Sequence, residues 1–200
     1  MIFFNRLVTL FDNIGWKIIY LFSTYIMYIK MWMIGIRFKK GVGFYGLMKF
    51  KKAANATIEI GTKCKFRSKP TSNLIGINRP CIISALTTKA NLKIGDNCGF
   101  SGTVIGCFCN IKIGKNVRCG ANTLITDSDW HLDDIRAGKP CPVIIENNVW
   151  LGVNVMVLKG VTIGENTIIG AGSVVVQDIP PNVVAAGNPC KIIKSINIWK

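Results

Sequence analysis

The stretch Val143–Asp178, VIIENNVWLGVNVMVLKGVTIGENTIIGAGSVVVQD, decides the fold because aliphatic residues recur in it at a fixed interval of six. The recurring positions are Ile145, Leu151, Val157, Ile163, Ile169 and Val175. A period of six fits neither an α-helix, with about 3.6 residues per turn, nor an alternating strand. It predicts a parallel β-helix, in which short strands meet at regular corners and like side chains stack from coil to coil.

Weaker copies of the same period lie earlier in the chain, where isoleucine-glycine pairs open hexapeptides at residues 60, 94 and 113. Three hexapeptides make one triangular coil, so Ile94 and Ile113, nineteen residues apart, are expected one coil apart with a single-residue bulge between them. Prolines and scattered polar residues interrupt the period over residues 68–90, and their register stays unassigned.

A polar insertion interrupts the repeats again, because twenty residues separate Ile125 from Ile145 in place of a multiple of six. It predicts an extruded loop over residues 126–143, and loops on a rigid scaffold are where functional residues concentrate. His131, the only histidine of the chain, lies in this loop. Imidazole titrates near neutrality and can take the proton of an attacking hydroxyl group. A lone histidine is more often structural, so the residue by itself leaves its role open.

The N-terminal quarter is both hydrophobic and basic. Residues 1–52 carry nine Lys and Arg against one acid, within a chain whose net charge is +15. Residues 14–36 are apolar and aromatic, but Lys17 and Lys30 leave no uninterrupted stretch long enough to span a bilayer. We expect a helix that lies at the inner face of the cytoplasmic membrane, with basic residues against anionic headgroups. Packing on the flank of the β-helix or in a subunit interface is the alternative, and spanning comes third.

Cysteine usage and charge narrow the class of protein. Eight cysteines occur without a CxxC pair or a signal-peptide cleavage site, and Cys64, Cys98 and Cys119 fall on repeat positions. They are expected to be buried small hydrophobic residues in a reducing cytoplasm rather than disulfides or zinc ligands. The positive charge predicts an anionic partner. Nucleic acid is not expected, because the basic region contains no binding motif and no interleaved aromatic platform.

The C-terminal stretch VWLGVNVMVLKGVTIGENTIIGAGSVVVQDIPPNVVAAGNPCKIIK resembles the hexapeptide-repeat acyltransferases. The likeness is to the maltose- and galactoside-type sugar O-acetyltransferases and the acetyltransferases of polysaccharide biosynthesis, and it covers about residues 55–194. It implies a mainly β fold, a left-handed parallel β-helix, a homotrimer, and acetyl-CoA as co-substrate with no metal. On this interpretation residues 1–52 form an N-terminal helical segment, 53–186 the β-helix, and 187–200 a basic tail.

The resemblance also implies roles for residues near the loop. It implies that His131 is the general base for direct attack on the thioester, without a Ser or Cys nucleophile. Asp127 and Asp129 are candidates for orienting the imidazole or binding substrate hydroxyls, and solvated turn carboxylates are the equal alternative. Where the family has an Asn that contacts the acceptor sugar, this chain has Gly102, and Ser101 could supply a hydroxyl instead. A free maltose-like or galactoside acceptor is therefore less expected.

The resemblance also assigns coenzyme contacts to individual residues of this chain. The positions that match family residues along the coenzyme groove are Ala121, Trp150, Gly152, Ala171, Lys191 and Lys194. The small residues would admit an extended pantetheine arm, and the two lysines would bind the coenzyme phosphates through charge-assisted contacts. The tryptophan could equally pack a corner, and the lysines could be part of a solvated tail.

These features together predict an acetyl-CoA-dependent O-acetyltransferase that acts on a sugar of a bacterial surface polysaccharide or its lipid-linked precursor. N-acetylation of a nucleotide-linked amino sugar and a non-catalytic β-helix scaffold are the alternatives. A zinc enzyme of the γ-carbonic-anhydrase kind needs three His ligands, and one His per chain could supply them only on a threefold axis. The expected location is cytoplasmic, with peripheral attachment to the membrane as a further expectation.

Overall fold

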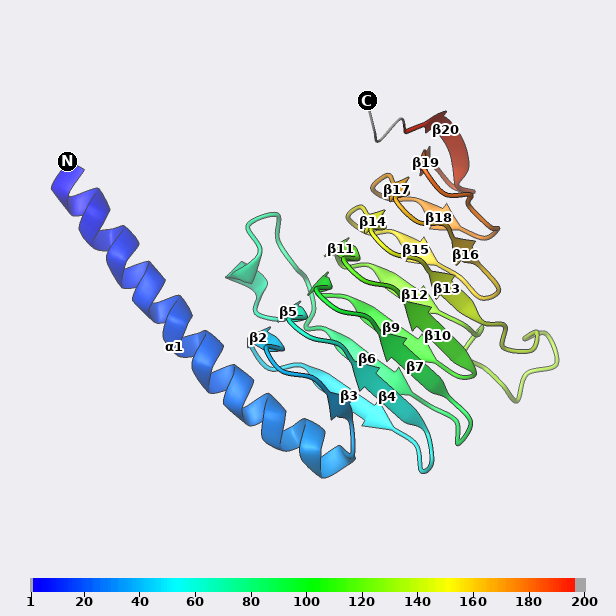
Figure 1. The fold of residues 1–200 in the computed structure, drawn as a ribbon, viewed down its shortest axis with the longest axis horizontal. Coiled ribbons are helices and arrows are strands. Elements are labelled where there is room, and N and C mark those ends of the chain that lie inside the picture. The colour runs from blue at the N-terminus through cyan, green and yellow to red at the C-terminus, as the bar shows by residue number, and fades with distance from the viewer. Residues whose placement is uncertain (1, 197–200) are drawn as a thin grey trace.

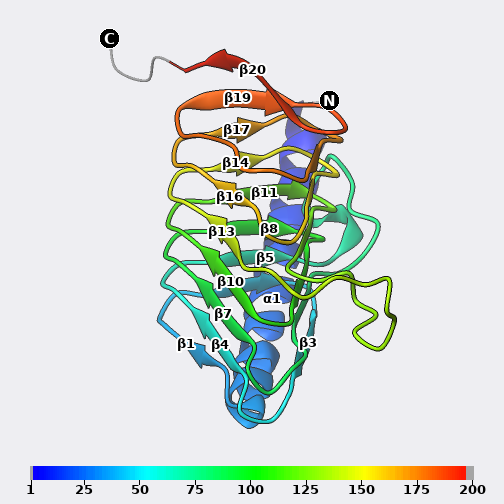
Figure 2. The same cartoon turned by 90° about the vertical axis from the view of Figure 1, so that its right-hand side faces the viewer.

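The computed structural model describes residues 2–196, which form one long helix followed by a triangular parallel β-helix (Figures 1 and 2). Helix α1 spans Ile2–Ile34, and a short 3₁₀ helix, η1, spans Pro70–Ser72. The strands form three sheets, here named faces A, B and C. All strand pairs are parallel except the last, β19 with β20, which is antiparallel.

Each face is a ladder of short strands. Face A contains β1 (Arg37–Phe38), β4 (Thr57–Ile60), β7 (Asn91–Ile94), β10 (Asn110–Ile113), β13 (Val143–Ile145) and β16 (Thr162–Ile163). Face B contains β2 (Gly43–Tyr45), β5 (Lys65–Arg67), β8 (Gly99–Ser101), β11 (Arg118–Ala121), β14 (Trp150–Leu151), β17 (Ile168–Ile169), β19 (Val183–Ala186) and β20 (Lys191–Ser195). Face C contains β3 (Lys49–Lys52), β6 (Ile82–Ala85), β9 (Val104–Cys107), β12 (Leu124–Thr126), β15 (Met156–Val157) and β18 (Val174–Val175).

The interval of six produces the interior stacks that the sequence predicted. On face A, Ile94 pairs with Ile113 one coil later, and the buried isoleucine column continues through the last coils. Face B begins with three stacked phenylalanines, Phe44, Phe66 and Phe100, whose ring centroids are 5.3 and 5.0 Å apart. The three repeat-position cysteines are buried as predicted. The parallel β-helix is therefore confirmed.

A ladder of asparagines, which the interval of six did not predict, runs along one corner. Its members adopt a left-handed backbone with φ between 57° and 59°, which Asn tolerates better than most residues. Each side-chain amide donates to the next at 2.9–3.0 Å. The ladder consists of Asn97, Asn116, Asn148, Asn166 and Asn182. The asparagine side chains at this corner thus satisfy one another's hydrogen-bonding groups from coil to coil.

The coil begins at residue 37, ahead of the boundary at 53 predicted from the repeats. Strands β1, β2 and β3 pair in parallel with β4, β5 and β6 and so make a complete first coil. Its inward residues Phe38, Phe44 and Phe50 keep the interval of six, but they are phenylalanines without the isoleucine-glycine pairs that mark the later coils. Residues 68–81 then leave the prism between β5 and β6, which accounts for the broken period there.

Helix α1 crosses the open end of the first coil (Figure 1). Met27 and Met31 are buried against the core, and three side chains of the helix bond to backbone groups of that coil. The contacts are Thr24 Oγ1 accepting from the Phe44 N–H at 3.1 Å, Tyr28 Oη donating to the Val42 carbonyl at 2.8 Å, and Lys30 Nζ donating to the Met48 carbonyl at 3.3 Å. The inner face of α1 therefore packs on the β-helix, as the alternative interpretation expected.

The outer face of α1 is exposed and apolar. It presents Ile18, Leu21, Phe22, Tyr25, Trp32 and Met33. No helix within residues 2–196 is both long enough and apolar enough to cross a bilayer. The basic tail predicted at 187–200 forms β20 over part of its length, and residues 197–200 lie outside the described residues.

Candidate functional site

The predicted loop leaves the prism between β12 and β13, at the corner where face C meets face A (Figure 2). Its neck is closed by a backbone bond from the Cys141 N–H to the Asp127 carbonyl at 2.9 Å. His131 lies beyond this neck with its side chain exposed. A base at this position is accessible to a substrate hydroxyl.

Asp127 has a role that neither expectation described. Its carboxylate is fully buried and accepts three backbone N–H bonds from the corner between β9 and β10. The donors are Phe108 at 2.6 Å, Cys109 at 2.8 Å and Asn110 at 2.8 Å. The carboxylate thus faces the preceding coil and anchors the start of the loop, instead of forming a solvated turn.

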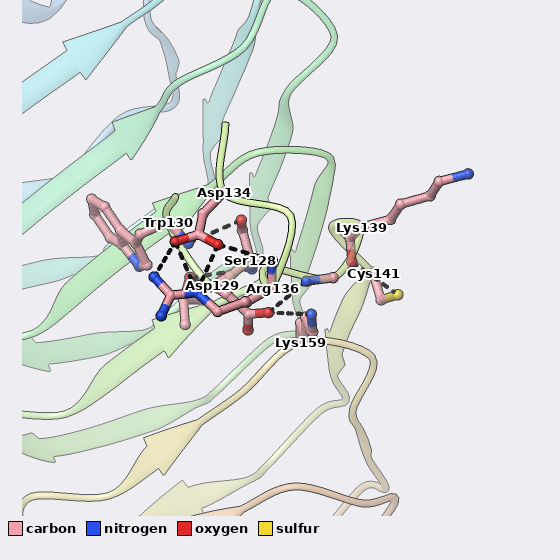
Figure 3. Close-up of polar contacts among 10 residues, drawn as sticks. Ser128, Asp129, Trp130, Asp134, Arg136, Lys139, Cys141 and Lys159 are labelled. Atoms are coloured by element: carbon pink, nitrogen blue, oxygen red, sulfur yellow. Dashed lines mark hydrogen bonds and ion pairs between the residues drawn. The ribbon is translucent and has the colours of Figure 1, made fainter. Parts of the chain in front are cut away.

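Asp129 is bound within the loop region rather than to the imidazole. Its Oδ2 accepts from Lys159 Nζ and from the Gly138 N–H at 3.1 Å (Figure 3). The Lys159 ammonium holds the pKa of this carboxyl below its usual range. Further along the loop, Asp134 forms an ion pair with Arg136. Among the hydrogen bonds of residues 2–196, none joins the His131 side chain to Asp127 or Asp129.

The Trp130 side chain packs the start of the loop against face C. Its backbone has φ of 72°, a left-handed conformation that is a genuine outlier for a bulky residue and is typical of functional sites. The ring covers Gly106, where an added Cβ would overlap it, and it meets the Phe108 ring edge-on at 5.3 Å between centroids. The residue is 43% exposed and lies on face C directly before His131. Sequence reasoning missed this residue, although a glycine in the outward row of face C was a signal for it.

Four of the predicted coenzyme positions meet in one groove on face B. Ala121, Trp150, Gly152 and Ala171 line this groove, whose volume is about 490 Å³. A Cβ on Gly152 would lie 2.6 Å from the Ala171 backbone nitrogen, so only glycine permits this approach of neighbouring coils. The groove is open and mostly apolar, which suits an extended pantetheine arm.

The two predicted lysines lie at the C-terminal end of the same face. Lys191 and Lys194 are exposed on β20, opposite Ala186 and Val184 of β19. They flank the last coil and do not line the groove described above. Their position leaves them free to meet a charged group that extends past the end of the groove.

Ser101 is buried on face B, and its hydroxyl accepts from the Asn73 amide at 3.1 Å. Beside it, Gly102 has φ of 55°, and a Cβ there would lie 2.8 Å from the Arg79 carbonyl oxygen. The segment 68–81 therefore packs where a side chain at 102 would project, which explains the departure from the family pattern. Ser101 lines a second hollow of about 470 Å³ on face B, together with Lys63, Lys65, Arg67 and Arg118.

Within one chain the loop and the face B groove do not meet. The loop leaves the corner opposite face B and projects away from it (Figure 1). His131 and the predicted coenzyme positions thus lie on different sides of the prism. In the described part of the chain no group of three or more His, Cys, Asp and Glu residues could hold a metal ion.

Comparisons with known proteins agree with the β-helix fold. Residues 142–177 match the family model described as bacterial transferase hexapeptide (six repeats). Galactoside O-acetyltransferase from Escherichia coli (strain K12) is 43% identical over 114 residues, which cover 54% of this chain and 56% of that protein. Galactoside O-acetyltransferase from Lactococcus lactis subsp. lactis (strain IL1403) is 47% identical over 92 residues, 44% of each chain. The chain thus spans about half the length of the curated relatives that it matches.

A solved structure supports the fold independently. An N-acyltransferase from Bacillus cereus, in complex with dTDP-4-amino-4,6-dideoxyglucose and coenzyme A, superposes with a TM-score of 0.65 at 18% identity. The superposition covers 84% of this chain and 88% of that one. At this identity the likeness concerns the fold alone. With its six matched repeats and its prism of parallel strands, the chain contains a hexapeptide-repeat β-helix, and over about half of its length it is similar to sugar O-acetyltransferases.

Proposed function

We propose that the chain is an acetyl-CoA-dependent O-acetyltransferase whose acceptor is a sugar of a bacterial surface polysaccharide or its precursor. One observation carries the proposal: the four positions matched to coenzyme-contacting family residues converge in the face B groove. The 43% identity to galactoside O-acetyltransferase from Escherichia coli over about half of the chain also supports it.

In the proposed reaction His131 is the general base. The imidazole takes the proton of the sugar hydroxyl as its oxygen attacks the thioester carbonyl carbon. Backbone N–H groups of the coil stabilise the tetrahedral oxyanion. When the intermediate collapses, the carbon–sulfur bond breaks and the imidazolium returns its proton to the leaving thiolate. No enzyme nucleophile takes part, so the acetyl group passes to the sugar in one transfer.

The reaction requires more than one copy of the chain. Because the loop projects away from face B, we infer that His131 of one copy acts beside the face B groove of the next, in a homotrimer. Three equivalent contacts close such an assembly around a threefold axis. Sedimentation of the purified protein measures this state directly, and a monomer with full activity would contradict it.

The activity is tested by mass spectrometry of the host's cell-surface glycan with and without this chain, together with transfer by the purified protein. We expect His131→Ala to lower the transfer rate by roughly 10²–10⁴-fold. Asp133→Asn is the matched control, because this carboxylate is exposed on the same loop. An unchanged rate in His131→Ala would show that the imidazole is not the base. Transfer to an amino group, or no transfer, would favour the N-acetyltransferase or the scaffold alternative.

We also propose that α1 attaches the chain to the inner face of the cytoplasmic membrane. Support comes from its exposed apolar face and from the positive charge of residues 1–52. Sedimentation with vesicles of phosphatidylglycerol and phosphatidylcholine tests the attachment. Phe22→Ser with Trp32→Ser should abolish it, whereas Leu74→Ser, at a residue 99% exposed on another segment, should not. Equal binding by both variants would contradict a role of α1.

A further inference from the structure

A hollow of about 850 Å³ lies on face C beside the His131 loop, and the reaction described above does not use it. Trp130 forms one wall, strand β3 forms the other, and α1 contributes Lys30. Its floor is apolar and includes Ile82 and Phe108. It adjoins the loop that carries the candidate base, because Trp130, which lines it, directly precedes His131 in the chain.

Three ammonium groups point to an anionic occupant. Lys49 and Lys51 alternate with buried Phe50 along β3, so both project outward from face C. Lys30 joins them from α1, and one of its N–H groups is already bonded to the Met48 carbonyl. No carboxylate lines the hollow, and none of the ion pairs found within residues 2–196 involves these lysines. A compact group with two or more negative charges would relieve their mutual repulsion.

The other surfaces of the hollow suit the non-charged part of such a ligand. The Trp130 ring is held over Gly106 and leaves 43% of the residue exposed. An indole offers a flat apolar surface for the C–H face of a sugar ring, together with an N–H donor. The apolar floor extends from the ring toward the lysines. A sugar on the ring and an anion on β3 would therefore lie side by side.

We propose that this hollow binds an acceptor sugar through a diphosphate group attached to it. The lysines contact the phosphate oxygens through charge-assisted hydrogen bonds, and the sugar lies against Trp130 within reach of the His131 loop. A single carboxylate of an acidic sugar would match only one of the three charges. The inference rests on the proposed transfer reaction, which it extends by naming the class of acceptor. A nucleotide carrier and a polyprenyl carrier both present this diphosphate chemistry.

Calorimetric titration of the full-length protein with inorganic pyrophosphate tests the site. We expect saturable binding by the wild type and a loss of at least tenfold in affinity for Lys49→Gln with Lys51→Gln. The control is Lys93→Gln with Lys112→Gln, which removes the same two charges from paired, exposed positions on face A near Glu59. Its affinity should stay within about twofold of wild type. No saturable binding by the wild type, or an equal loss in both double variants, would overturn the proposal.

Two further ligands distinguish the carriers. Tighter binding of farnesyl diphosphate than of pyrophosphate assigns a polyprenyl carrier, and tighter binding of uridine diphosphate N-acetylglucosamine assigns a nucleotide carrier. If neither exceeds pyrophosphate, the assignment of a diphosphate-linked sugar fails. Binding is measured without turnover, so the two proposals can fail separately. Pyrophosphate bound by a chain that transfers no acetyl group would refute the reaction alone, whereas full transfer by the Lys49 and Lys51 double variant would refute the hollow as the acceptor site.

Discussion

Truncation of Asp127 to alanine is expected to destabilise the fold and to loosen the loop that carries His131. The carboxylate is fully buried and accepts N–H bonds at 2.6, 2.8 and 2.8 Å from three consecutive residues. Removing it leaves three donors without a partner at the corner between β9 and β10. It also removes the side chain that anchors the start of the loop.

The magnitude follows from those three bonds. A hydrogen bond to a charged group contributes about 1.5–3 kcal/mol, and a stranded buried donor costs about 1–3 kcal/mol. Phe108 is buried and bears this cost in full, while Cys109 and Asn110 are half-buried, so water can reach their N–H groups. We therefore expect Asp127→Ala to lower the free energy of unfolding by about 3–5 kcal/mol. Asp127→Asn keeps one acceptor oxygen and should cost about 1–3 kcal/mol.

Urea unfolding at one fixed protein concentration measures the loss. With a slope of about 2–3 kcal/mol/M, the alanine variant should unfold at a urea concentration about 1–2.5 M lower than wild type. Hydrogen exchange should speed up at residues 108–110 and across the loop, and remain unchanged in the asparagine corner. Asp133→Asn, in the same loop, should stay within about 0.5 kcal/mol. A cost below about 1 kcal/mol for the alanine variant, or unchanged exchange at 108–110, would refute the anchoring role.

Three further outcomes are expected. Gly106→Val should displace the Trp130 ring and lower transfer as much as Trp130→Ala does, and the double variant should show no additional loss in rate. Because Lys159 lowers the pKa of Asp129, their ion pair stabilises the fold above about pH 4 and loses this effect as the pH falls. The urea midpoint of Lys159→Gln should thus lie below that of wild type at pH 7, and the difference should shrink as the pH falls below about 4. Iodoacetamide at pH 8 should label Cys141 first, as mass spectrometry would show, because its side chain is exposed.

The parts of the fold predicted from sequence are those in which spacing alone determines structure. Aliphatic residues every six places can stack only in a prism, so the later coils and the loop that interrupts them followed from the period. The first coil was missed, because its inward residues Phe38, Phe44 and Phe50 are aromatic and lack the isoleucine-glycine pairs of the later coils, although they recur every six places. Its boundary was therefore placed at 53 and not at 37.

The places of the candidate residues in the fold could be inferred from the sequence, but their contacts could not. His131 and the small residues of the face B groove followed from the loop and the family resemblance. The partners of Asp127 come from a corner 17 to 19 residues earlier, and such a pairing exists only once coils are stacked. The same holds for Asp129 with Lys159, which are 30 residues apart, and for Trp130 on Gly106. Local sequence around each of these residues resembles an ordinary polar turn.

The way α1 meets the first coil has a consequence for self-assembly. A stack of parallel strands that ends in bare N–H and C=O groups invites a second stack to continue it, and an unlimited fibre would result. Thr24 and Tyr28 bond to two of those groups on face B at one terminus of the stack, and β20 runs in the opposite sense along the final rung of face B. Neither element resembles a hexapeptide, so another molecule cannot extend the pattern from it. Helix α1 and strand β20, which lie outside the hexapeptide repeats, therefore oppose end-to-end assembly of the β-helix.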